Sequence, residues 1–269
     1  MLHPKTSTII HDKVPRHVFM KLFKLLILCL GLIAYTQASP DTPDLKKNFL
    51  IGNSLTWDTI PGLLADDTQW HVDCGVPLRH IYAKPDKPCV KTSTIWPKAL
   101  KEKQYDQISI QPHYGATFSQ DLETISNWVK LQPKATIIIH TGWAYHAERQ
   151  QEYENHCGDK MQHTQQYFDN LLKELRERFP GRKFKRTLAM DILQQAHLDI
   201  VEGKSPLKDV AELYRDKIHM THEGGRYLMH NAMRFALGQP RSAEGFEKTP
   251  PKLKTYLDSL LDRTLKCSP

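Results

Sequence analysis

The stretch Asn48-Phe-Leu-Ile-Gly-Asn-Ser-Leu-Thr56 joins an apolar segment to a small polar turn. Residues 49–51 predict a short strand that stops at Gly52, and a helix is predicted from about Thr59. Such a turn can present the Ser54 hydroxyl at the carboxyl edge of a sheet, where ligands bind in open α/β sheets. The start of the helix would add unpaired N–H groups and a positive dipole end, which stabilise a developing oxyanion. The alternative is an ordinary turn, because Gly, Asn and Ser are common turn residues.

A second polar segment, far along the chain, carries the side chains that a serine nucleophile requires. Asp216 and His219 lie three residues apart, just before a segment with helical periodicity. A serine hydroxyl needs a base at neutral pH, and histidine is the side chain whose ordinary pKa suits that role. A carboxylate on the same loop can fix the tautomer of the histidine ring. The alternative is an exposed Asp–His pair at the start of a helix.

Together the two segments resemble the SGNH (GDSL-like) hydrolase superfamily. Its first block is a strand followed by Gly-Asp/Asn-Ser, here Gly52-Asn-Ser54, and its last block is Asp-x-x-His, here Asp216-Lys-Ile-His219. The resemblance covers roughly residues 46–240. It implies a three-layer fold of flavodoxin type and a serine ester hydrolase without a cofactor. In that mechanism Ser54 attacks an acyl carbonyl and forms an acyl-enzyme, His219 is the base, and Asp216 orients His219.

The resemblance also implies an oxyanion hole, but one of its donors departs from the family pattern. The backbone N–H of Ser54 and that of Gly75, just past the second predicted strand, are two expected donors. The third is usually an Asn in a Gly-x-Asn block, whereas this chain has Gln111-Pro-His-Tyr-Gly115. We expect the Gln111 amide to donate there, with the His113 ring as the alternative. A turn that merely closes the strand is the other possibility.

The order of predicted elements indicates an α/β fold. Five short segments rich in apolar and β-branched residues predict strands, at 48–52, 70–74, 106–111, 135–140 and 187–190. Apolar residues recur at helical spacing between them, most clearly over 122–129 and 167–179. Strands that alternate with helices favour a parallel sheet covered on both faces. We therefore predict a three-layer α/β/α architecture around a central, mainly parallel five-stranded sheet.

The beginning of the chain is typical of an exported protein. Residues 20–39 combine lysines, an apolar run over 25–34 and a small residue, Ala38, which are features of a secretory signal peptide. The apolar run is short for a membrane span. We therefore divide the chain into an extension with signal peptide over 1–38, a linker over 39–46 and a single domain over 47–269. Cleavage would give a secreted or periplasmic protein without a stable membrane span, and an uncleaved anchor is the alternative.

The positive charge of the chain does not indicate a nucleic-acid partner. The net charge is +7, but residues 1–38 hold five basic residues against one acidic residue, so cleavage would remove four of these charges. The remaining sequence has no dense basic run of the kind that contacts phosphates.

The cysteines are consistent with export. Outside the signal segment they are Cys74, Cys89, Cys157 and Cys267. Four cysteines in an exported protein allow three pairings, and the local pair Cys74–Cys89 is the one we predict. Two or more free buried thiols are the alternative.

Two other functions compete with ester hydrolysis. A metal enzyme could use the cluster of His219, His222, Glu223 and His230, but His-x-x-His-Glu does not match the usual zincin spacings. A non-catalytic carbohydrate-binding protein could share the fold, since fold does not fix function. For the enzyme, the expected substrate is a small-molecule or polysaccharide ester, with carbohydrate deacetylation as one form.

Overall fold

The structure is a computed structural model that describes residues 45–154 and 158–266. The predicted signal peptide, most of the predicted linker, Cys157 and Cys267 lie outside these residues. The described residues belong to one compact unit of the chain. Within them, no helix is both long and apolar enough to cross a membrane.

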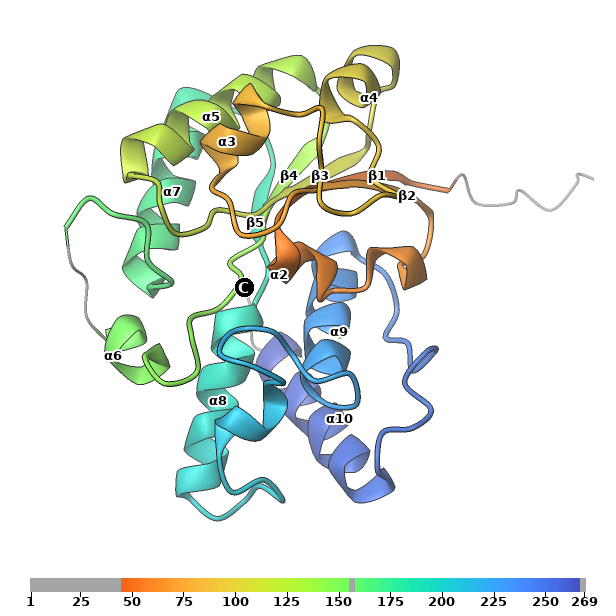
Figure 1. The fold of residues 1–269 in the computed structure, drawn as a ribbon, viewed down its shortest axis with the longest axis vertical. Coiled ribbons are helices and arrows are strands. Elements are labelled where there is room, and N and C mark those ends of the chain that lie inside the picture. The colour runs from red at the N-terminus through yellow and green to blue at the C-terminus, as the bar shows by residue number, and fades with distance from the viewer. Residues whose placement is uncertain (1–44, 155–157, 267–269) are drawn as a thin grey trace, which may run out of the picture. The chain divides into compact units, whose positions relative to one another are not determined.

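A parallel sheet forms the centre of the fold (Figure 1). Its order is β2-β1-β3-β4-β5, and each neighbouring pair is parallel. This is the flavodoxin-like strand order, in which the chain reverses its direction of winding beside β1. The predicted fold class is therefore confirmed. The strands are β1 (Lys47–Gly52), β2 (Asp67–Val72), β3 (Gln107–Ile110), β4 (Thr136–Ile139) and β5 (Phe184–Arg186).

Side chains that alternate along the strands divide the core in two. Phe49 and Ile51 of β1 join one apolar cluster, whereas Leu50 between them joins another. This follows from the two-residue period of a strand, which points neighbouring side chains to opposite faces. Because both faces are buried there, β1 and β4 contain continuous apolar runs, at residues 49–51 and 137–139.

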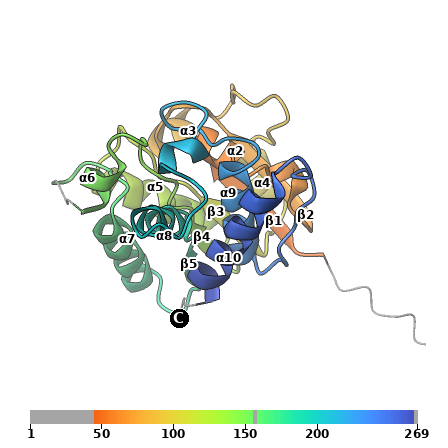
Figure 2. The same cartoon turned by 90° about the horizontal axis from the view of Figure 1, so that it is seen from below.

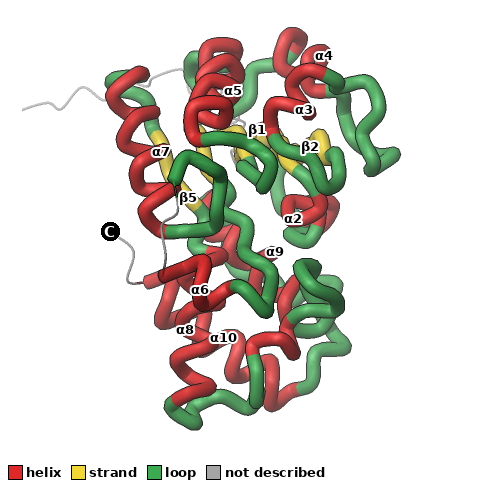
Figure 3. The backbone as a smooth tube through the Cα atoms, turned by 60° about the vertical axis from the view of Figure 1, so that its left-hand side comes forward, coloured by secondary structure: helices red, strands yellow, loops and turns green. Residues whose placement is uncertain are grey.

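Helices cover both faces of the sheet (Figures 2 and 3). One face packs against α3 (Leu78–Ala83), α4 (Trp96–Glu102), α5 (Phe118–Leu131) and α7 (Gln165–Arg178). The other face packs against α9 (Gly225–Leu237), and α8 (Ala189–Val201) and α10 (Pro251–Lys266) pack against α9 and each other. The short elements are α2 (Ser54–Trp57), α6 (Arg149–Glu154) and the 3₁₀ turns Pro61–Leu63 and Val210–Leu213.

Several predicted boundaries are wrong for local reasons. The predicted strand 187–190 instead covers the two-residue link after β5, which ends at Arg186, and the first two residues of α8. The helix expected from about Thr59 begins at Ser54, because the Asn53 side chain caps it there. Val210–Leu213 forms only a 3₁₀ turn, and the connection between β4 and α7 contains α6.

Candidate functional site

The turn that carries Ser54 is fixed by its own sequence. A Cβ atom on Gly52 would lie 2.1 Å from Thr56 Oγ1 and 2.8 Å from Gln111 Oε1, so a larger residue would force the turn open. Asn53 then caps α2, since its Oδ1 accepts the Leu55 N–H at 2.9 Å. Ser54 is consequently the first residue of this helix, directly past the carboxyl end of β1, and its side chain is half-buried.

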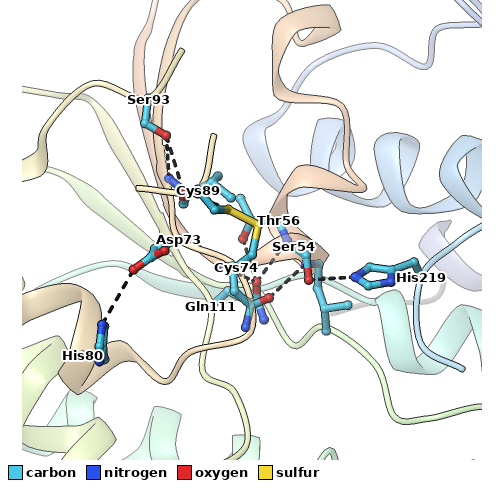
Figure 4. Close-up of a disulfide and its surroundings, with 12 residues drawn as sticks. Ser54, Thr56, Asp73, Cys74, His80, Cys89, Ser93, Gln111 and His219 are labelled. Carbon is cyan, nitrogen blue, oxygen red and sulfur yellow. Dashed lines mark hydrogen bonds and ion pairs between the residues drawn. A yellow bond between two sulfur atoms is a disulfide. The ribbon is translucent and has the colours of Figure 1, made fainter. Parts of the chain in front are cut away.

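The structure brings Ser54 and His219 together, although 165 residues separate them in the chain. His219 Nε2 lies 2.9 Å from Ser54 Oγ, and Figure 4 shows the ring directed at the hydroxyl. On the opposite side of the ring, Nδ1 lies 2.9 Å from Asp216 Oδ2 and 3.0 Å from Oδ1. The three side chains thus form one hydrogen-bonded line, which is the arrangement that activates a serine hydroxyl.

Asp216 is held as a carboxylate by its neighbours. Burial raises the pKa of this carboxyl, but the N–H groups of His219 and Ile218 and the ring of His219 outweigh that effect and lower the pKa to about 2. The two N–H groups donate to Asp216 Oδ1 at 2.8 and 3.0 Å. At neutral pH an ionised Asp216 therefore faces Nδ1, so that Nδ1 carries the proton and Nε2 is free to accept one from Ser54.

Gln111 lies beside this turn and contacts it through its carbonyl oxygen. Gln111 Oε1 accepts hydrogen bonds from Asn53 N–H at 3.1 Å, Thr56 N–H at 3.0 Å and Thr56 Oγ1 at 2.9 Å. Its amide nitrogen donates to the Pro112 carbonyl at 3.2 Å, and the residue is only 1% exposed. These contacts hold the turn. Direct donation from Gln111 to an oxyanion stays a prediction.

Gly75 lies in the loop between β2 and α3, with a left-handed φ of +68° that suits glycine. The loop starts beside the end of β1, because Asp73 N–H donates to the Gly52 carbonyl at 3.0 Å. The predicted disulfide Cys74–Cys89 is confirmed, with Cα atoms 5.6 Å apart, and it anchors this loop directly before Gly75 (Figure 4). Both Cys74 and Gly75 are exposed.

His113 belongs to a buried polar cluster next to the site. Burial lowers the pKa of His113 to about 3, with a further contribution from the nearby His163, so the ring is neutral at physiological pH. His163 is tied to Glu152 of α6, which lies 3.2 Å from its Nδ1, and the Tyr114 hydroxyl donates to the same carboxylate at 2.7 Å. The cluster connects α6 to the loop after β3.

The segment after β4 packs against the loop that carries Asp216 and His219. Trp143 is fully buried, and its indole N–H donates to the Ile218 carbonyl at 2.6 Å. The His146 N–H donates to the Lys217 carbonyl at 3.0 Å. His140 is also fully buried, with its Nδ1 2.9 Å from Thr187 Oγ1. Trp143 and His140 are therefore packed supports of the site.

Sequence reasoning missed Asp58, a fully buried carboxylate at the end of α2. It receives hydrogen bonds from Arg215, Met220 and Arg226, all of which come from the region around His219. A signal was present in the sequence, because each of the two sequence blocks has charged residues besides the candidate triad, Asp58 after Ser54 and two arginines around His219.

Comparisons with known proteins find similarity only at the level of the fold. A scan against protein-family models finds no match, and a search of curated proteins finds none either. The similar solved structures include the salicylyl-acyltransferase SsfX3 from a tetracycline biosynthetic pathway, at TM-score 0.43 and 11% identity, covering 78% of this chain and 58% of that one. A protein of Parabacteroides merdae described as a GDSL-like lipase aligns at TM-score 0.43 and 14% identity, covering 72% and 97%. An active-site mutant of a family two carbohydrate esterase from Clostridium thermocellum aligns at 0.41 and 12%, covering 73% and 65%.

The sheet order and the meeting of the two sequence blocks at Ser54 and His219 decide the type of fold. The fold is SGNH-like. Because the identities and TM-scores are this low, the function proposed below rests on the chain's own residues.

Among the described residues of this SGNH-like fold, no group of three or more His, Cys, Asp or Glu side chains is placed to hold a metal ion. The histidines considered for a metal site have other contacts. His219 faces Ser54, and His230 is buried with its Nδ1 2.7 Å from the Thr59 carbonyl.

Proposed function

We propose that this protein is an exported serine ester hydrolase in which Ser54, His219 and Asp216 perform acyl transfer to water. The observation that carries the proposal is the 2.9 Å contact between His219 Nε2 and Ser54 Oγ, with the Asp216 carboxylate on the other ring nitrogen. The contact joins the two sequence blocks that together resemble the SGNH superfamily.

In the proposed reaction, Ser54 Oγ attacks the acyl carbon of an ester while His219 Nε2 takes its proton. The tetrahedral intermediate collapses when the C–O bond to the alcohol breaks, and His219 returns the proton to the alcohol oxygen. Water then attacks the acyl-enzyme with His219 again as base, which releases the acid and regenerates Ser54. Asp216 stabilises the imidazolium that forms in each step.

The oxyanion would be bound by N–H groups around Ser54. Gln111 and Asn53 accept the other leading N–H groups of this turn, those of Asn53, Leu55 and Thr56. None of the described residues accepts the N–H of Ser54 itself, which leaves it to donate to the oxyanion. We propose the Gly75 N–H as the second donor, because its loop begins beside the end of β1. Gln111 is the third candidate that the sequence predicts.

We further propose that the alcohol part of the substrate is polar, as in a carbohydrate ester. A groove of about 460 Å³ lies along the loop that carries Asp216 and His219, lined by Tyr145, His146, Ala147, Glu148 and Lys217. Its lining combines an aromatic ring with charged and polar groups, which suits a hydroxylated ring better than a long alkyl chain. A polysaccharide or small-molecule ester of a short acid would fit this lining.

The proposal is tested with a fluorophosphonate probe and the variant Ser54→Ala. Wild type should be labelled on the peptide that contains Ser54, and should hydrolyse p-nitrophenyl acetate. Ser54→Ala should lose the label and lower kcat by several orders of magnitude, as the loss of a triad member does. Unchanged hydrolysis in Ser54→Ala would remove the esterase proposal. An unlabelled, inactive wild type that still binds polysaccharide would instead favour the carbohydrate-binding alternative.

A further inference from the structure

One buried carboxylate connects the two halves of the candidate site. Asp58 is fully buried and lies four residues after Ser54, and its N–H donates to the Ser54 carbonyl at 2.9 Å. Its side chain points away from this helix toward the loop of His219. There Asp58 Oδ2 accepts the Met220 N–H at 2.8 Å, and Oδ1 accepts Arg215 Nη1 at 3.1 Å.

A second arginine completes the set of donors. Arg226, in the first turn of α9, contacts Asp58 Oδ1 through Nε at 2.8 Å and through Nη2 at 2.6 Å. Hydrogen bonds from charged donors to a carboxylate are about twice as strong as neutral ones. Because Asp58 is fully buried, its carboxylate would be costly to leave unpaired if these donors were removed.

These contacts hold the loop on both sides of Asp216 and His219. Arg215 directly precedes Asp216, and Met220 directly follows His219. The Arg215 N–H also donates to the His219 carbonyl at 2.8 Å, which closes the loop on itself. One carboxylate at the end of the nucleophile's helix therefore holds both ends of the segment that supplies the base and its acceptor.

We propose that Asp58 is a positioning residue that sets the distance between Ser54 Oγ and His219 Nε2. The inference rests on the proposed function, because it assigns Asp58 an effect on that reaction. Asp58 does not touch the reacting atoms. It acts through the loop, and a displacement of the base by about 1 Å can cost roughly 10²-fold in rate. A buried ion pair with only a structural role would stabilise the fold without affecting His219 in particular.

A double-mutant cycle separates these roles. Asp58→Asn keeps the size of the side chain, but its amide group cannot accept from both sets of donors. We expect it to lower kcat by roughly 10²-fold with little change in KM. In a His219→Ala background the same substitution should lower the residual activity by less than about 3-fold, because the base that it misplaces is already absent.

The controls make each failure distinct. Asp199→Asn is the matched control, since Asp199 is 2% exposed and pairs with Arg263 far from the site. It should keep kcat within about 2-fold, as distant sites behave independently. Arg226→Met, which leaves Asp58 two donors, tests the same coupling in a variant that is easier to fold. If Asp58→Asn lowered kcat by the same factor in the wild-type and His219→Ala backgrounds, the inference would be overturned while the proposed triad stood. Full activity in His219→Ala would overturn the proposed function itself.

Discussion

Gln111 should affect activity through its carbonyl oxygen. The variant Gln111→Ala removes the acceptor of three donors, the N–H groups of Asn53 and Thr56 and the hydroxyl of Thr56. A buried donor that loses its partner costs about 1–3 kcal/mol, so even with partial relaxation we expect a loss of about 3 kcal/mol in the free energy of unfolding. For a domain of this size, that corresponds to a Tm lower by roughly 6–12 °C.

The same variant should also displace Ser54, the proposed nucleophile. With the turn released, kcat should fall by roughly 10²-fold, because small displacements of reacting groups are costly. Gln132→Ala is the matched control. Gln132 is fully buried and makes a comparable set of bonds, to Tyr105 N–H and to the carbonyls of Leu100 and Lys103. It should lose similar stability in urea denaturation but keep its kcat, measured at a temperature where all variants are folded.

Gln111→Glu distinguishes the carbonyl from the amide. It keeps an oxygen facing the turn and replaces the amide nitrogen, which donates to the Pro112 carbonyl, by a second oxygen. Because the residue is only 1% exposed, an ionised carboxylate here would cost several kcal/mol, so kcat is measured at a temperature where the variant is folded. From the observed contacts we expect kcat to stay within about 10-fold of wild type, whereas loss of an oxyanion donor would cost roughly 10²–10³. A loss of that larger size would instead support the Gln111 donor predicted from the sequence. If Gln111→Ala changed neither Tm nor kcat, the reasoning from the three hydrogen bonds would be refuted.

Three further predictions concern stability and processing. Burial raises the pKa of Asp121 to about 7, against the opposing effect of the Tyr167 hydroxyl. The folded protein therefore keeps a proton that the unfolded chain loses above its ordinary pKa near 4, so the free energy of unfolding should fall between about pH 4 and pH 7 by up to ~4 kcal/mol. Urea titrations of Asp121→Asn should lack this fall. Replacing Cys74 and Cys89 by serine should cost about 2–4 kcal/mol, since their disulfide closes a loop of 15 residues, and dithiothreitol should lower the Tm of wild type but not of the double variant. N-terminal sequencing of exported protein should begin at or near Ser39, and an intact N-terminus in the membrane fraction would show an anchor instead.

The sequence predicted the central strands well because burial on both faces leaves a simple pattern. Residues 49–51 and 137–139 are apolar and fully buried, so their runs could be recognised directly. The outer strand β5 was misplaced because its middle residue, Lys185, is exposed, and a short charged strand at an edge has no such pattern. The more apolar segment just after it predicts a strand instead, but its last two residues begin α8.

In the candidate site, too, some residues could be predicted from the sequence and others could not. Ser54, Asp216 and His219 could be found because their chemistry demands particular residue types at short spacing. The contacts of Asp58 with Arg226, 168 residues away, follow only from how the layers pack, and no local pattern specifies them. The sequence predicts Gln111 as part of the site. Which end of its amide faces the turn depends on three donors that become neighbours only in the folded chain.

The distance in sequence between Ser54 and His219 determines when activity can appear during synthesis and folding of the chain. The strand and helix that present Ser54 are synthesised early, whereas the Asp216–His219 loop and the helix behind it belong to the last part of the domain. In the proposed mechanism, a serine without its base is a poor nucleophile. A half-made or partly unfolded chain therefore carries a chemically inert Ser54, and hydrolysis begins only when the two ends of the domain have met. Recovery of esterase activity during refolding would then report completion of the whole fold, not of any part of it.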